Sequence, residues 1–163
     1  MNKLILSAFA DEYADGLKEQ CEALNKFAIE YIELRGVNGK NVSVLTENEV
    51  RETKKTLDDF GIKVSSIGSP LGKIDIKGDL NGHYETAKRV YETANILGAK
   101  NVRMFSFYSK ETPFDKCKSE VYAGLEKLVK EAGGIVTKKA FVLAEGKAAE
   151  REDIVYLATI PLL

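Results

Sequence analysis

Residues 31–35 read Tyr-Ile-Glu-Leu-Arg, and residues 102–105 read Val-Arg-Met-Phe. Both runs have the length of a strand, and successive side chains of a strand point to opposite faces. Charged Glu33 and Arg103 then lie on one face of their strands, with apolar residues on the other. A central strand of an open parallel sheet is covered by helices on both faces and is usually apolar on both. Charges on one face favour the interior of a barrel near its mouth; the simpler interpretation is one buried Glu33–Arg103 ion pair.

Strand-like and helix-like segments alternate along residues 4–132, which predicts βα units with parallel strands and right-handed crossovers. Glycines or a proline punctuate the segments, and Thr46 and Glu49 have the spacing of a capping box. The predicted strands are Leu4–Phe9, Tyr31–Arg35, Lys63–Gly68 and Asn101–Phe107. The predicted helices run from Tyr13 to Phe27, from Thr46 to Gly61, from His83 to Leu97 and from Thr112-Pro113 to Ala132. Pro113 is expected at the first position of the last helix. The predicted fold class is α/β: a truncated (βα)8 TIM barrel of about four to five βα units. An open flavodoxin-like sheet is the alternative.

Composition and local sequence argue against several classes of partner. The formal net charge is −1 with both signs spread along the chain, so a nucleic-acid partner is not expected. No apolar run is long enough to cross a membrane, and no secretory signal is visible, so we expect a cytoplasmic protein without a membrane partner and with Cys21 and Cys117 reduced. The turn Ala10–Asp15 is acidic and lacks a glycine-rich phosphate cradle, which argues against nucleotide or flavin binding.

Four segments in order carry a resemblance to a known family. They are Leu-Ser-Ala-Phe-Ala-Asp-Glu (6–12), Tyr-Ile-Glu-Leu-Arg (31–35), Val-Ser-Ser-Ile-Gly-Ser-Pro-Leu-Gly-Lys-Ile (64–74) and the region 83–108. Together they resemble the N-terminal half of the sugar phosphate isomerases and epimerases of the xylose-isomerase-like TIM-barrel family. The resemblance covers roughly residues 3–132. It implies a barrel mouth that binds a small sugar or sugar phosphate, and a divalent metal (Mg, Mn, Zn or Co) that polarises the substrate carbonyl.

The chain departs from that pattern after Ala132. In the family, strand five ends in a motif like His-Glu-Asn-Glu and strands five to eight supply the metal ligands. Here residues 133–163 form a divergent tail with predicted fifth and sixth strands at Ala140–Glu145 and Ile154–Ile160. Glu145 is the stand-in for the strand-five carboxylate, with an exposed loop glutamate as the alternative. His83, the only histidine, is interpreted as a surface or capping residue rather than a ligand.

The tail also suggests a shifted reading frame. Bases that encode Thr137–Phe141 can be chosen so that, read one base earlier, they spell Asn-Glu-Lys-Gly-Ile, a run common after the family's strand-five motif. We therefore expect the chain to be a truncated product with little isomerase activity alone. Open sheet edges would favour homo-oligomers.

The candidate substrate-binding residues are Glu33, Arg35, Arg103, Phe105 and Tyr108. Arg103 suits bidentate binding of a phosphate or carboxylate, with neutralisation of Glu33 as the alternative. Asp11 and Glu12 are expected to cap the first helix. Three function classes stay open: an isomerase or epimerase, a non-catalytic half-barrel remnant, and a small-ligand-binding module.

Overall fold

A computed structural model describes residues 5–109, 112–133 and 155–156. Its strands and helices follow one another in the alternation that the sequence predicts. They are β1 (Ser7–Ala8), the 3-10 turn η1 (Ala10–Glu12), α1 (Leu17–Lys26), β2 (Tyr31–Leu34), β3 (Gly36–Val37), β4 (Lys40–Asn41), η2 (Val42–Val44), α2 (Glu47–Asp59), β5 (Lys63–Gly68), α3 (Leu80–Leu97), β6 (Val102–Phe105), α4 (Phe114–Glu131) and β7 (Val155–Tyr156).

The order of the strands decides between the two α/β architectures. The main sheet runs β1-β2-β5-β6-β7, and the first four strands are parallel neighbours in chain order. A doubly wound sheet reverses its order at a switch point, and this sheet does not. Four βα units laid down in sequence are the arrangement of a TIM barrel, so the truncated barrel is confirmed as the fold.

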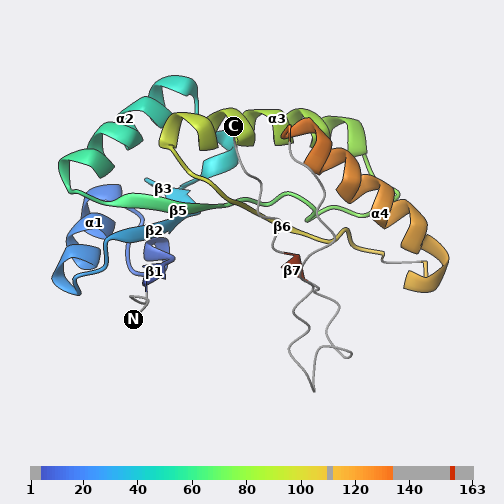
Figure 1. The fold of residues 1–163 in the computed structure, drawn as a ribbon, viewed down its shortest axis with the longest axis horizontal. Helices are drawn as coiled ribbons and strands as arrows, with labels where there is room; N and C mark the ends of the chain where they lie inside the picture. Colours follow the sequence, from blue (N-terminus) through green and yellow to red (C-terminus); the bar gives the residue numbers. More distant parts are fainter. Residues whose placement is uncertain (1–4, 110–111, 134–154, 157–163) are drawn as a thin grey trace, which may run out of the picture.

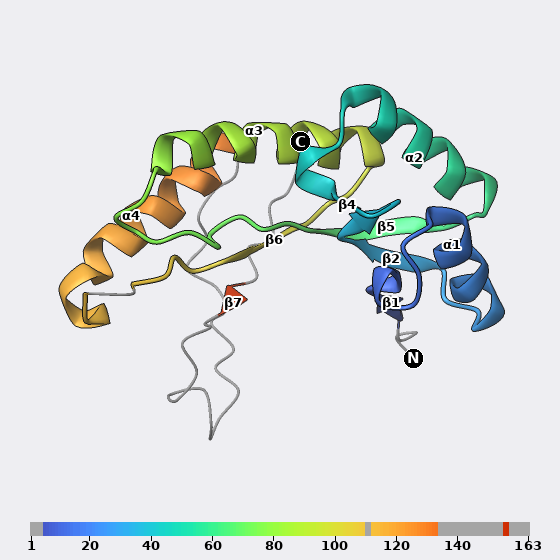
Figure 2. The same ribbon diagram turned by 180° about the vertical axis from the view of Figure 1, so that it is seen from behind.

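Helices cover one face of this sheet. In Figure 1, α2 and α3 lie above the strands and α4 descends from beside α3 past the outer end of β6, and Figure 2 shows the same arrangement from behind. Ile32, Leu34 and Met104 are at most 1% exposed and belong to the core between the sheet and the helices. Glu33 and Arg103 alternate with them and are only partly buried. The charged side chains therefore lie on the face that the described helices leave uncovered, as their spacing predicts.

Local sequence signals determine several helix ends. Thr46 and Glu49 form the predicted capping box at the start of α2. Gly61 and Gly98 follow α2 and α3 with φ of 70° and 69°, which glycine adopts without steric cost.

Three predicted starts are wrong. The first helix begins at Leu17, not Tyr13, because Ala10–Glu12 forms a separate 3-10 turn. The third begins at Leu80 because the Asp79 side chain accepts a hydrogen bond from Gly82 N at 3.1 Å. Pro113 takes the N-cap position of α4 rather than the first helical position.

The sheet ends in an antiparallel pair. Val155 and Tyr156 of β7 pair with Phe105 and Met104 of β6 in the antiparallel direction. Val155 and Tyr156 lie within the predicted sixth strand, Ile154–Ile160, for which the sequence predicts no direction. Neighbouring strands of a (βα)8 barrel are parallel, so this antiparallel pair differs from a regular barrel. The predicted fifth strand, Glu145 and the rest of the predicted sixth strand lie outside the described residues. In the part of the chain that is described, no helix has the length and apolar character needed to cross a bilayer.

Candidate functional site

An ion pair occupies the uncovered face of the sheet. Arg103 Nε lies 2.7 Å from Glu33 Oε1, and the two side chains are 16% and 21% exposed. Both atoms are buried, and neither has a well-directed hydrogen bond to another described residue. The two strands are not neighbours, because β5 runs between them. The predicted convergence of Glu33 and Arg103 is confirmed, and the pair reaches across the intervening strand.

Small residues on β5 make this reach possible. Ser66 is the register partner of Glu33, and Gly68 is that of Arg103. A Cβ atom on Gly68 would lie 3.0 Å from Arg35 Cβ and 3.3 Å from Arg103 Nη2. The lack of a side chain at Gly68 therefore lets the two arginines pack closely over β5. The sequence contains a signal for this role, since Gly68 directly follows Ile67 at the end of the strand, but a glycine there predicts only a strand end.

Aromatic rings hold the arginines in place. The Arg103 guanidinium carbon lies 4.9 Å from the ring centres of both Phe9 and Phe105, and that of Arg35 lies 4.9 Å from Phe9. Lys73 Nζ lies 4.4 Å from the Phe105 ring. Cations over aromatic faces are attracted by the ring quadrupole. We call these five residues the mouth cluster: Phe9, Arg35, Lys73, Arg103 and Phe105. Arg103 and Phe105 lie on β6, and the other three lie in the segments that follow β1, β2 and β5.

Arg35 is held by two acidic side chains. Its Nε donates to Asp11 Oδ2 at 2.7 Å, and its Nη2 donates to Glu12 Oε1 at 3.3 Å. The hydrogen bond with Asp11 is the largest cause that raises the pKa of Arg35. Asp11 and Glu12 thus do not cap the first helix as expected, because η1 turns their carboxylates toward β2. A pocket of about 220 Å³ opens beside Arg35, between Asp11 and Lys40.

Tyr108 lies further along the chain from β6. It contacts the loop between β5 and α3 through its backbone: Tyr108 N donates to Ile74 O at 2.9 Å, and Ile76 N donates to Tyr108 O at 2.8 Å. The structure thus brings four of the predicted substrate-binding residues, Glu33, Arg35, Arg103 and Phe105, together in or beside the mouth cluster. Tyr108 supports the neighbouring loop.

His83 is neither a surface residue nor a cap. It is half-buried in the first turn of α3, and its Nε2 accepts a hydrogen bond from Gly72 N at 2.8 Å. Its ring meets Phe107 edge to face, with centroids 6.1 Å apart. The expectation failed because the partner, Gly72, comes from a loop whose path the sequence does not reveal.

A resident metal does not fit the described residues. Within residues 5–109, 112–133 and 155–156, the structure places no group of three or more His, Cys, Asp or Glu side chains that could hold a metal ion. The acidic groups at the mouth, Asp11, Glu12 and Glu33, instead pair with arginines. The described half of the mouth therefore presents cations and aromatic rings rather than a group of metal ligands.

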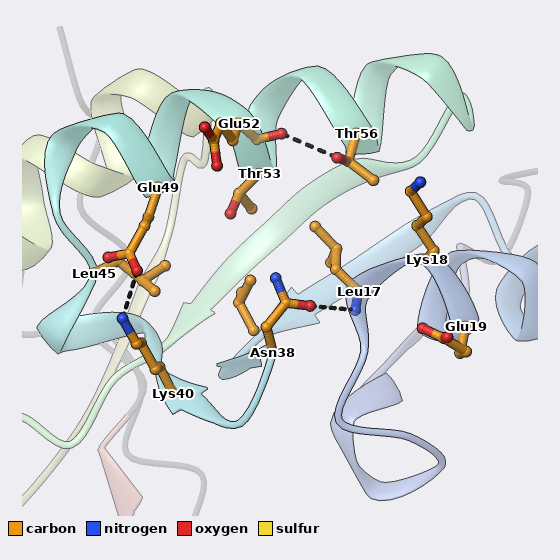
Figure 3. A pocket seen from close by; sticks show the side chains of 11 residues that line it. Leu17, Lys18, Glu19, Asn38, Lys40, Leu45, Glu49, Glu52, Thr53 and Thr56 are labelled. Carbon is orange, nitrogen blue, oxygen red and sulfur yellow. Dashed lines mark hydrogen bonds and ion pairs between the residues drawn. The ribbon is translucent and has the colours of Figure 1, made fainter.

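A second hollow lies between α1 and α2 (Figure 3). It has a volume of about 260 Å³. The β3–β4 hairpin closes one side: Lys40 Nζ donates to Glu49 Oε1 at 2.5 Å, and Leu17 N donates to Asn38 Oδ1 at 3.0 Å. These contacts tie the hairpin to the first turns of both helices. The hollow is thus part of the helix packing and not of the mouth.

Solved structures share this fold. The chain aligns with the probable 3-DHS dehydratase of Bacillus anthracis involved in petrobactin synthesis, at a TM-score of 0.61 and 15% identity, over 81% of this chain and 48% of that one. It aligns with a D-psicose 3-epimerase crystallised in the presence of D-fructose at a TM-score of 0.56 and 17% identity, over 80% and 49% of the two chains. It also aligns with a xylose isomerase-like TIM-barrel protein from Mycobacterium smegmatis in complex with magnesium. The TM-score is 0.53 and the identity 18%, over 77% of this chain and 44% of that one.

These likenesses show the fold and its extent. The chain spans about half the length of the solved barrels that it matches. No protein-family model matches the sequence, and no curated protein matches it. The chain thus has the fold of half a xylose-isomerase-like TIM barrel, consistent with the N-terminal half.

Proposed function

We propose that this chain is the substrate-facing N-terminal half of a sugar or sugar-phosphate isomerase or epimerase of the xylose-isomerase-like kind, acting in the cytoplasm. The observation that carries the proposal is the Glu33–Arg103 pair, held at 2.7 Å between Phe9 and Phe105 on the uncovered face. Structural neighbours include a D-psicose 3-epimerase and a 3-keto-D-glucoside 4-epimerase, which supports a small sugar as the ligand.

The groups at the mouth suit a polyhydroxylated ligand. A guanidinium donates to hydroxyl or phosphate oxygens, a carboxylate accepts from hydroxyls, and the edges and faces of Phe9 and Phe105 can contact the C–H surface of a sugar. Because the Glu33–Arg103 contact lacks hydrogen-bond geometry, Arg103 can turn toward a ligand without breaking a well-directed bond. Gly68 lets Arg35, Phe9 and Arg103 pack closely over β5, which gathers these groups at one place.

Turnover requires more than this half. The described residues contain no metal-holding group, and Glu145 remains the proposed carboxylate for a divalent cation. Losing even one member of a catalytic group commonly costs orders of magnitude in rate. We therefore expect the chain alone to bind a sugar weakly. Its turnover number should lie far below the usual kcat of roughly 1–1000 per second. Binding without turnover, as a ligand-binding half-barrel, is the second candidate.

Calorimetric titration tests the proposal. D-fructose and D-fructose 6-phosphate should both bind the isolated chain, and Arg103→Gln should weaken binding about tenfold or more, because a hydrogen bond to a charged group is lost. Arg51→Gln is the matched control. Arg51 also pairs with a glutamate, at 2.6 Å, but on the exposed outer surface of α2.

Either of two results contradicts the proposal: neither sugar binds, or Arg103→Gln binds as the wild type does. Turnover in the ordinary enzyme range with added Mg²⁺ would contradict the expected deficiency of the half-barrel while leaving the sugar site in place.

A further inference from the structure

The loop between β5 and α3, residues 69–79, runs along β6 and forms one side of the mouth. Ser69 Oγ donates to Arg103 O at 2.5 Å, and Phe105 N donates to Leu71 O at 2.7 Å. Further out, Tyr108 N donates to Ile74 O at 2.9 Å. The loop is thus hydrogen-bonded to the strand that carries Arg103 and Phe105.

The closest approach is at Gly72. Its φ is +83°, and a Cβ atom there would lie 1.8 Å from Phe105 O. Only glycine can bring the loop backbone this near to the mouth end of β6. The next residue, Lys73, places Nζ 4.4 Å from the Phe105 ring. The position of Lys73 in the mouth cluster therefore depends on where Gly72 is held.

One side chain from outside the loop fixes Gly72. His83 Nε2 on α3 accepts the Gly72 N–H at 2.8 Å. An acceptor nitrogen carries no proton, so the imidazole is neutral and has its proton on Nδ1. If Nε2 were protonated, two N–H groups would face each other and the bond would be lost.

We propose that neutral His83 is a positioning residue for the mouth, holding loop residues 71–73, and with them Lys73, against Phe105. The consequence for a ligand rests on the proposed function, whereas the hydrogen bond and its loss are properties of the free protein.

The charged groups in the loop and on the elements next to α3 each have their own partner. They are Lys73, Asp75 and Lys77 in the loop, Asp79 before α3, Arg103 on β6 and Glu120 on α4. Lys73 lies over Phe105, Asp75 accepts from Lys77 N, Lys77 Nζ pairs with Glu120, Asp79 caps α3, and Arg103 pairs with Glu33. Burial is the cause that lowers the pKa of His83 below its ordinary 6.5. A lowered pKa means that the bond is present at neutral pH and is lost as the pH falls through the folded-state value.

Amide NMR on the free chain tests the proposal. Because the chain has one histidine, a single imidazole signal reports its titration. We expect the Gly72 amide shift to follow the same midpoint, below pH 6.5, and its exchange protection to fall about tenfold on the acid side, as a buried donor loses its partner. His83→Leu should lose that protection at neutral pH. His83→Gln keeps an acceptor without a titrating ring and should retain part of the protection at every pH.

The amide of Ile67, which donates to Asn101 O at 2.9 Å in the sheet, is the control. It should keep its protection in each variant. A Gly72 amide that ignores the imidazole midpoint, or protection of Gly72 and Ile67 falling together in His83→Leu, overturns the proposal.

Sugar titrations separate the positioning role of His83 from the proposed sugar-binding function. Weaker D-fructose binding by His83→Leu than by His83→Gln supports a positioning role at the mouth, and equal binding overturns that role. If D-fructose does not bind the wild type, the proposed function fails, and the amide result still decides whether His83 holds the loop.

Discussion

At the scale of single residues, Gly72 and Gly98 are glycines for two different reasons. Both have positive φ, at 83° and 69°, but a Cβ on Gly72 would meet Phe105 O at 1.8 Å, whereas a Cβ on Gly98 would meet nothing within 4 Å. Each alanine substitution costs about 1–2 kcal/mol for the left-handed backbone. Gly72→Ala should cost about 1–3 kcal/mol more, the usual cost of overpacking.

Urea unfolding of Gly72→Ala and Gly98→Ala measures the difference in the free energy of unfolding. Equal losses for the two variants would mean that the loop moves away from β6 without cost, and the close approach would then have no role in stability.

The Glu33–Arg103 pair makes a second prediction at this scale. A double-mutant cycle with Glu33→Gln and Arg103→Gln should give a coupling energy of about 1–3 kcal/mol, because the two side chains are 16% and 21% exposed. The control is Glu47–Arg51 at 2.6 Å with side chains 67% and 62% exposed, where coupling of about 0.3–0.5 kcal/mol is expected. Similar coupling in both pairs would show that burial adds nothing at the mouth.

At the scale of elements, the capping box joins α2 to the β3–β4 hairpin. Glu49 Oε2 accepts from Thr46 N at 2.8 Å, and Oε1 accepts from Lys40 Nζ at 2.5 Å. These hydrogen bonds lower the pKa of Glu49 from 4.5 to about 2, and the bond from Lys40 has the largest effect. The stabilisation from ionised Glu49 is therefore present above pH 4.5 and is lost as the pH falls toward about 2.

Thermal unfolding as a function of pH checks this. Glu49→Gln should lower the melting temperature at pH 7, and its difference from the wild type should shrink through the acid window. Glu52→Gln on the same helix, whose carboxylate makes no hydrogen bond to a described residue, should behave as the wild type. A Glu49→Gln difference that does not change with pH would contradict the assigned cause.

Local signals were enough to predict that the four parallel strands and the four longer helices exist, but they did not predict the β3–β4 hairpin or the first residue of three helices. The capping box at Thr46 and the glycine after Leu97 act through neighbours a few residues away, so the sequence shows them directly. Strand alternation likewise predicted the faces of Glu33 and Arg103. The missed features depend on long-range packing: Asp11 reaches Arg35 across 24 positions, and Gly72 reaches His83 across a loop. No local pattern encodes these partners.

At the scale of the whole molecule, β1 is an edge strand of the sheet that the described residues form. Ile5 and Leu6, just before this strand, are 64% and 58% exposed. An exposed strand edge with apolar neighbours favours pairing with another chain. We expect concentration-dependent association in sedimentation, shifted toward monomer by Ile5→Lys. Tyr122→Lys, on the surface of α4, is the control. A monomer at all concentrations would contradict association through this edge.

Amide chemical shifts that map where D-fructose binds test most directly whether the uncovered face is a sugar-binding mouth. We expect perturbations at Gly68 and Gly72, at and after the end of β5, and at Arg103 and Phe105 of β6, and we expect them to disappear in Arg103→Gln. Perturbations at Asn38, Lys40 and Thr53 in the hollow between α1 and α2, with the mouth amides unmoved, would contradict the central claim that the uncovered face is a sugar-binding mouth.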